Sequence, residues 1–252
     1  MDKAYLTVKR IDSNHLKIIA IVAMVIDHIA YAFVSDGTIL GQVMHTIGRI
    51  TMPIMCFTLS EGYHKTKSIK KYIIRLFIFA IISHIPYQFF STGKLPIAFD
   101  SLNDVYIKFP TSVIYTLFIG VISLIVWNSK KLNKFLKTII LLILLGASTL
   151  GDWGITCVLW VLVFGIFYGD FKKQVIGYLI VALPLLLMPG LMILNIVDGA
   201  WWEEICIFGL LIPIPLLSHY NKKLGGYNLK WLFYIFYPLH LLVIGYIKYY
   251  VL

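Results

Sequence analysis

Long apolar runs separated by short polar stretches extend along the whole chain. The runs cover 16–34, 43–63, 72–90, 112–127, 135–150, 153–168, 174–194, 203–217 and 231–250. They approach the ~20 residues that an α-helix needs to cross a bilayer, although several are short and the fifth and sixth are separated only by a turn at Gly151-Asp152. Backbone groups in lipid need internal hydrogen bonds, and no apolar–polar alternation indicates a β-barrel. The pattern predicts an all-α integral membrane protein with about nine transmembrane helices, within a range of about eight to ten.

The composition leaves little of the chain outside these runs. Hydrophobic residues make up 60% of the 252 residues, charged residues make up 13%, and the mean hydropathy is +0.85. No internal repeat, low-complexity tract or linker divides the sequence, so residues 1–252 are predicted to form a single transmembrane domain. There is no room for a separate soluble catalytic domain. Any chemistry must therefore come from residues in or beside the helical bundle.

Positive charge is distributed unevenly between the two sides of the predicted bundle. The formal net charge is +10, and when alternate connections are assigned to opposite sides, seventeen Lys and Arg residues fall on one side and three on the other. Cytoplasmic loops of membrane proteins carry such an excess. The chain is therefore predicted to lie in the cell membrane as a multi-pass protein with a cytoplasmic N-terminus and an external C-terminus. The clustering favours the lipid bilayer over nucleic acid as the partner.

The first apolar run differs from a cleavable secretory signal. It extends over 16–34, which is longer than the core of a signal peptide, and it contains Asp27 and His28. We therefore expect a retained spanning helix.

The cysteines give no indication of a metal or disulfide site. Cys56, Cys157 and Cys206 all lie inside apolar runs, without a C-x-x-C motif or a histidine at ligand spacing. We expect buried packing for all three and no metal. The sequence also lacks a P-loop and a G-x-G-x-x-G fingerprint.

Five ionisable residues fall within the predicted spans: Asp27, His28, Arg49, His84 and His240. Charge at membrane depth is costly, so such groups usually face a partner or a polar cavity. Counting along each span places them at similar depths, which predicts that they converge. The structural alternatives are that a histidine joins two helices through a carbonyl, or that Arg49 pairs with Asp27.

Lys17 and His28 lie on one predicted helix, eleven residues apart. This spacing puts them on the same face with ~16 Å of rise between them. The pair would suit a long substrate with an anionic head and a reactive tip, whereas the simpler interpretation is that Lys17 reaches lipid phosphate.

Several motifs together resemble the TraX family over nearly the whole chain. They are 16–20 (LKIIA), 24–29 (MVIDHI), 48–54 (GRITMPI), 61–63 (EGY), 71–76 (KYIIRL), 83–87 (SHIPY), 151–154 (GDWG) and 237–241 (YPLHL). The family is named for a protein that acetylates the N-terminus of a conjugative pilin subunit. The spacing from Lys17 to His28 is also similar to the Arg/Lys-x10-His signature of the acyltransferase-three family, whose members transfer acyl groups from cytoplasmic coenzyme A to external acceptors.

The resemblance implies a transmembrane acetyltransferase with acetyl-CoA as the donor. It places His28 in the catalytic position as general base, with Asp27 and Arg49 beside it. The expected active-site cavity contains Glu61, His84, Ser112, Asp152 and His240, and the expected coenzyme A contacts are Lys17, Lys70, Lys71 and Arg75. Ser112 stands where the family favours asparagine. The outward-facing acceptor, an amine or a hydroxyl, is unknown.

Two other classes of protein fit the same residues. A transporter could use buried His, Asp and Arg as a relay, although the chain lacks the internal repeat common among transporters. A non-catalytic assembly factor for a pilus or envelope complex could use them to bind partner helices. The connection at 91–111 is expected to form a folded cap or a re-entrant turn.

Overall fold

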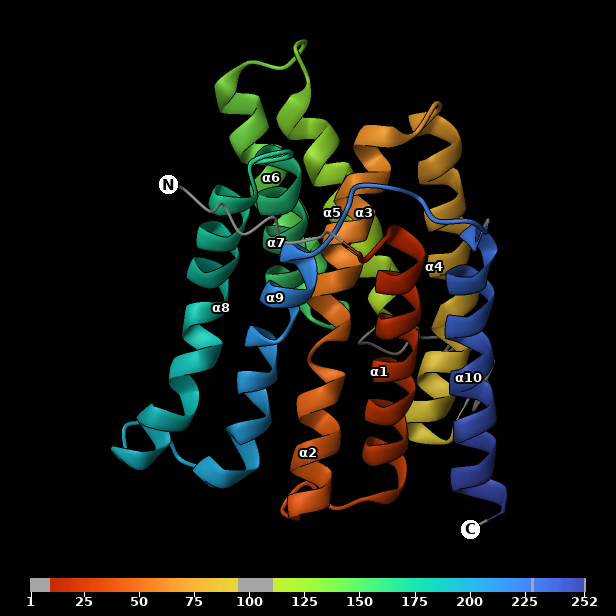
Figure 1. Cartoon of the computed structure of the whole chain (residues 1–252), viewed down its shortest axis with the longest axis vertical. Helices are drawn as coiled ribbons and strands as arrows, with labels where there is room; N and C mark the ends of the chain where they lie inside the picture. Colours follow the sequence, from red (N-terminus) through yellow and green to blue (C-terminus); the bar gives the residue numbers. More distant parts are fainter. Residues whose placement is uncertain (1–9, 95–110, 228, 252) are drawn as a thin grey trace, which may run out of the picture.

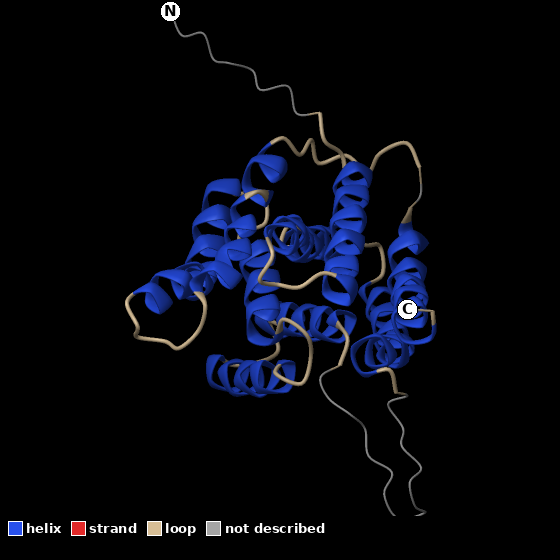
Figure 2. Cartoon of the chain, turned by 90° about the horizontal axis from the view of Figure 1, so that it is seen from below, coloured by secondary structure: helices blue, strands red, loops and turns tan. Residues whose placement is uncertain are grey.

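The computed structural model describes residues 10–94, 111–227 and 229–251, which fold into a bundle of helices (Figure 1). In chain order the helices are α1 Ser13–Phe33, α2 Ile39–Gly48, α3 Thr51–Lys65, α4 Ile69–Thr92, α5 Val113–Asn128, α6 Lys134–Ser148, α7 Gly154–Ile166, α8 Phe171–Ile193, the 3₁₀ helix η1 Trp201–Leu211, α9 Pro213–Ser218 and α10 Lys230–Tyr250. Figure 2 shows these helices joined by loops, with no β-strand in the described ranges. Most of the connection at 91–111 lies outside the described residues.

The expectation of nine transmembrane helices is not supported. Five helical stretches are long and apolar enough to cross a membrane: Ser13–Phe33, Ile69–Thr92, Phe171–Ile193, Trp201–Ser218 and Trp231–Tyr250. The other apolar runs fold into shorter helices, of which the longest, α5, has 16 residues. A helix of that length rises ~24 Å, less than the ~30 Å of a bilayer's hydrocarbon core. The chain is a helical membrane protein with fewer full-length spans than its apolar runs indicate.

The short helix α7 lies in the core of the bundle. It packs against α3, α5, α6 and α8, and Trp160 and Phe164 on it are almost completely buried. A helix that is apolar on all sides is suited to such a position as well as to lipid. The apolar run at 153–168 therefore reflects contact with other helices.

The apolar run at 43–63 is two helices because a proline interrupts it. In a continuous helix the ring of Pro53 would clash with the carbonyl of Arg49, four residues earlier. Instead α2 ends at Gly48, and Pro53 falls in the first turn of α3, where a missing N–H costs little. The break between α2 and α3 lies partway along the bundle (Figure 1), and Arg49 is one of the two residues between the helix ends.

Basic loops gather at one end of the bundle, the upper end in Figure 1. The connections between α3 and α4, α5 and α6, α7 and α8, and α9 and α10 lie toward this end, and α1 begins there. The connections from α1 to α2 and from α8 to η1 lie at the opposite end, as does the end of α10. We call the upper end the basic end. The described lysines of these loops, which the sequence assigns to one side of the membrane, thus all lie at the basic end.

Helices α1 and α2 approach closely because α2 has a glycine at the contact. A Cβ added to Gly48 would overlap the side chain of Asp27, including its Cβ and Cγ. A glycine at this position lets the Asp27 carboxylate lie directly against the backbone of α2.

Gly48→Ala is expected to lower the free energy of unfolding by about 1–3 kcal/mol, the usual cost of overpacking a filled site. Thermal unfolding of the protein in nanodiscs would measure this change. Gly146→Ala is the matched control, because nothing lies within 4 Å of a Cβ added there. It should leave stability unchanged or raise it by up to about 1 kcal/mol. Equal stability of the two variants would contradict the close approach of α1 and α2.

Candidate functional site

A cavity of about 330 Å³ opens in the half of the bundle away from the basic end. Its lining includes five carboxylates, two histidines and one arginine, and we call it the acidic cavity. The lining residues are Asp27, His28, Tyr31, Asp36, Gln42, His45, Arg49, Tyr87, Phe90, Ser91, Asp152, Trp153, Glu203, Glu204 and Cys206. They come from α1, α2, α4 and η1, the α1–α2 loop, and the turns beside Arg49 and before α7.

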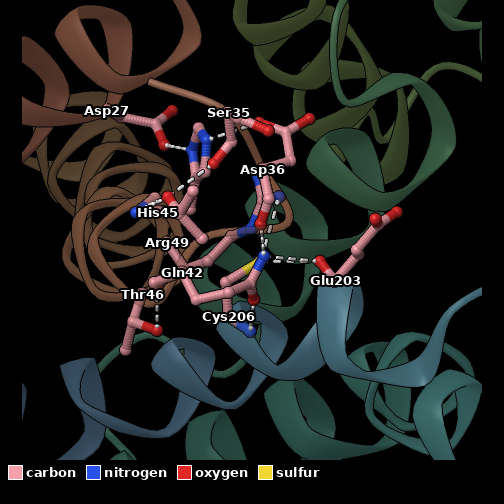
Figure 3. A network of polar contacts seen from close by, with 11 residues as sticks. Asp27, Ser35, Asp36, Gln42, His45, Thr46, Arg49, Glu203 and Cys206 are labelled. Carbon is pink, nitrogen blue, oxygen red and sulfur yellow. Dashed lines mark hydrogen bonds and ion pairs between the residues drawn. The ribbon is translucent and has the colours of Figure 1, made fainter.

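His45 is held between two carboxylates (Figure 3). Its Nδ1 lies 2.8 Å from Asp27 Oδ1, and its Nε2 lies 3.1 Å from Asp36 Oδ1. An ionised carboxylate only accepts hydrogen bonds, so both ring nitrogens donate and the ring is an imidazolium. His45 is 7% exposed, and the two carboxylates compensate the cost of its buried charge.

Gln42 joins three parts of the cavity wall (Figure 3). Its Nε2 donates to the carbonyl of Asp36 at 2.7 Å and to the carbonyl of Glu203 at 2.9 Å. Its Oε1 accepts from the backbone N–H of Cys206 at 3.0 Å. One side chain of α2 therefore holds both the α1–α2 loop and the start of η1.

Arg49 forms no ion pair with a carboxylate of the described residues. Its Nη2 lies 3.7 Å from Cys206 Sγ, and its guanidinium stacks 5.5 Å from the centre of the Trp153 ring. Its buried Nε has no hydrogen-bond partner in the described ranges. The carboxylate of Asp27 contacts His45 instead, so the alternative that Arg49 clamps Asp27 does not hold. A guanidinium without a carboxylate partner is available to an anionic group in the cavity.

The rings of His28 and His240 meet across α1 and α10. Nδ1 of His28 lies 3.0 Å from Nε2 of His240, and Nδ1 of His240 donates to the carbonyl of Phe236 at 2.9 Å. His28 lines the acidic cavity, whereas His240 is 7% exposed and lies behind it. The structure thus brings these two residues together.

Asp152 reaches the cavity from a constrained turn before α7. Its backbone N–H donates to the carbonyl of Thr111 at 3.0 Å, and its carbonyl accepts from the Thr116 hydroxyl at 2.6 Å. Its Oδ1 accepts from the backbone N–H of Trp153, a residue in the left-handed region with φ 61°. These bonds place the carboxylate on the same cavity as Asp27 and Arg49.

A second cavity, of about 370 Å³, lies toward the basic end. Lys17, Lys65 and Arg75 supply its positive charge, and we call it the basic cavity. Its other lining residues are mainly apolar or aromatic: Met55, Thr58, Leu59, Gly62, Thr66, Tyr72, Leu76, Ile114, Leu117, Leu224, Leu229, Phe233, Tyr234 and Tyr237. Tyr237 connects the two sites, since it lines the basic cavity and its ring lies 5.7 Å from that of His240.

The other predicted site residues lie outside the acidic cavity. Glu61 pairs with Lys65 and accepts from the Tyr220 hydroxyl at 3.3 Å, near the basic end. The hydroxyl of Ser112 and both ring nitrogens of His84 are buried without a hydrogen-bond partner among the described residues. Lys70 and Lys71 are exposed on the first turn of α4 and do not line the basic cavity.

Several residues of the acidic cavity were not predicted from the sequence. His45 has a signal in the sequence, because it precedes Arg49 by four residues and so shares a face with it. Gln42, Asp36, Glu203 and Glu204 lie at the edges of apolar runs, where polar residues are ordinary. The described residues contain no group of three or more His, Cys, Asp or Glu side chains placed to hold a metal ion.

Asp27→Ala is expected to lower the free energy of unfolding by about 1.5–3 kcal/mol, because it leaves the buried His45 ring without its shorter charged partner. Asp36→Ala is the control, since it removes the other partner of the same ring. The Asp36 side chain is 66% exposed, so its loss should cost about 1 kcal/mol or less. In a His45→Gln background most of the Asp27→Ala effect should disappear; an unchanged effect would show that the pair does not stabilise the fold.

Comparisons with known proteins agree with the family resemblance of the sequence. A protein-family model described as "TraX protein" matches residues 12–248. A protein of Dichelobacter nodosus named "Probable fimbrial assembly protein FimC, serogroup H1" is 34% identical over 231 residues, which cover 90% of this chain and 91% of that protein. No solved structure matches the chain. Because the family match extends over almost the whole sequence, the chain belongs to the TraX family.

Proposed function

We propose that this protein acts in the assembly of fimbriae or related surface fibres, by transferring an acetyl group to a component of the fibre or envelope. The name of the Dichelobacter nodosus relative supports the first part. The second part is supported by one arrangement: His28 lies on an acidic cavity, and His240 and Tyr237 connect it to a basic cavity at the other end. The further relation to the acyltransferase-three family stays a prediction from the spacing of Lys17 and His28.

The basic cavity suits acetyl-CoA as the donor substrate. Lys17, Lys65 and Arg75 offer cations to phosphates, while the apolar walls suit an alkyl arm. Lys17 and His28 are both on α1, with ~16 Å of rise between them. A donor held this way keeps its phosphates at the basic end and its thioester near His28. The phosphates then avoid the desolvation cost of the hydrocarbon region. This orientation makes the basic end cytoplasmic.

The acidic cavity suits an acceptor that carries positive charge. Its five lining carboxylates exceed the charges of Arg49 and the His45 imidazolium. Electrostatic complementarity of this kind favours a cation over a neutral group. Between an amine and a hydroxyl, the charge of the cavity favours an amine that arrives as an ammonium ion.

The proposed reaction requires one base and one group that stabilises an oxyanion. Neutral His28 takes a proton from the ammonium, and the free amine attacks the thioester carbonyl. Arg49 stabilises the negative charge that develops on the carbonyl oxygen. The carbon–sulfur bond then breaks, the amide forms, and the second amine proton goes to the leaving thiolate. The step consumes an amine and a thioester and yields an amide and free thiol, without any oxidant or reductant.

The second candidate is an assembly protein without catalysis. The name of the relative favours it, and in that case the polar residues would bind helices of fibre subunits. The two proposals differ in one measurable property, because only the enzyme consumes acetyl-CoA.

His28→Ala is expected to abolish acetyl transfer by the purified protein in nanodiscs, because the variant has no base at the cavity. Mass spectrometry of an amine-bearing peptide incubated with acetyl-CoA would measure the transfer. Fibre assembly in cells that carry the variant should fail at the same time. If the parent protein never consumes acetyl-CoA yet fibre assembly depends on its presence, the non-catalytic proposal is correct.

Replacing Lys17 and Arg75 together with glutamine should raise the KM for acetyl-CoA by at least about tenfold, since each lost phosphate contact weakens donor binding. The KM for the acceptor peptide should change little. Lys172→Gln with Lys173→Gln is the matched control, because both lysines are exposed at the basic end and neither lines the cavity. An equal rise in the control would mean that general surface charge, and not the basic cavity, attracts the donor.

A further inference from the structure

We infer that His240 is a positioning residue, which holds His28 in the tautomer that has its proton on Nδ1 and its lone pair on Nε2. This inference rests on the proposed function in one respect: the Nε2 lone pair is the base of the transfer reaction. The tautomer itself follows from the hydrogen bonds of the two rings.

The chain of hydrogen bonds starts at a backbone carbonyl. Nδ1 of His240 lies 2.9 Å from the carbonyl of Phe236, and a carbonyl can only accept. Nδ1 of His240 therefore carries a hydrogen. In a neutral ring the other nitrogen, Nε2, then has the lone pair and accepts.

The acceptor on His240 determines the proton position on His28. Nε2 of His240 lies 3.0 Å from Nδ1 of His28, so Nδ1 of His28 must donate. A neutral His28 is left with its lone pair on Nε2.

Neutral rings suit the surroundings of this pair. His240 is 7% exposed, and its ring stacks on Phe236 with an interplanar angle of 9°. The edge of the His28 ring meets Phe90, with ring centres 5.2 Å apart. No hydrogen bond or ion pair joins either ring to a carboxylate in the described part of the chain. His45 differs from these two rings, because it lies between two carboxylates.

The arrangement differs from a simple pin between two helices. A structural pin requires a hydrogen bond in either direction, whereas a base requires one defined nitrogen to be free of its proton. Of the two rings of this pair, His28 lines the acidic cavity and His240 does not, so His240 acts through His28 and contacts no substrate there. Asp27, the neighbour of His28 in sequence, does not take this role because it bonds to His45.

Nitrogen-15 NMR of histidine-labelled protein in lipid nanodiscs tests the tautomer without any activity measurement. The two ring nitrogens of a neutral histidine have different chemical shifts according to which carries the proton. His28→Gln identifies the His28 signals by their loss. In the parent protein we expect a protonated Nδ1 and an unprotonated Nε2 on His28; a protonated Nε2 would overturn the inference.

Two variants of His240 separate its hydrogen bond from its bulk. His240→Phe keeps an aromatic ring against Phe236 but removes the acceptor, and the His28 signals should shift toward the Nε2–H tautomer. His240→Gln retains an acceptor, its amide oxygen, and should preserve the Nδ1–H tautomer. His64→Phe is the control, since His64 bonds to the carbonyl of Gly165 at 2.8 Å near the basic end and does not touch His28. If His240→Phe leaves the His28 tautomer as it is in the parent, His240 does not position it.

The kinetic readout links the tautomer to the proposed function. His240→Phe should lower kcat by about 10²-fold, the usual contribution of a general base, while the KM for acetyl-CoA changes little. His240→Gln should retain most of kcat. A purely structural role would instead lower thermal stability and leave the kcat of the folded fraction unchanged. If the parent protein has the expected tautomer but transfers no acetyl group, the proposed function fails and the tautomer assignment stands.

Discussion

The cost of placing charge inside an apolar bundle determines how this protein is built. A charged side chain at depth needs a partner or open water, because an isolated charge in a low-dielectric interior is strongly unfavourable. His45 meets this requirement with two carboxylates, and Glu61 meets it with Lys65 and Tyr220. Arg49 contacts a sulfur and an aromatic ring but no carboxylate. The cavity beside it therefore contains a guanidinium whose charge no carboxylate of the described residues compensates by direct contact.

The sequence predicted the all-helical fold and the grouping of the basic loops more reliably than the number of spans. Each apolar run does become a helix or a pair of helices, and the basic loops do share one end. The runs at 112–127 and 153–168 become core helices, α5 and α7, because hydropathy responds to removal from water and not to contact with lipid. The division of the run at 43–63 could have been predicted from Pro53, whose ring cannot follow Arg49 in a regular helix.

The candidate site could be predicted only in part. Asp27, His28 and Arg49 line one cavity, and His240 contacts His28, as their similar depths suggested. His84, predicted at a similar depth, lies outside this cavity, whereas Asp152, which the family resemblance suggested, lines it. The hydrogen-bond partner of Asp27 could not be predicted from depth along a span. It depends on how closely Gly48 lets α1 and α2 approach each other. The placement of Glu203 and Glu204 depends on how η1 packs on α2, which has no local signal in the sequence.

The three bonds of Gln42 also have a mechanical consequence. The α1–α2 loop, α2 and the start of η1 are tied to a single amide, so none of the three can shift alone without breaking a bond to that side chain. The α1–α2 loop, α2 and the start of η1 therefore form one connected part of the cavity wall. The part of the wall formed by Tyr87, Phe90 and Ser91 of α4 makes no hydrogen bond to the Gln42 side chain among the described residues. The mouth of the cavity therefore has one wall whose three segments can move only together.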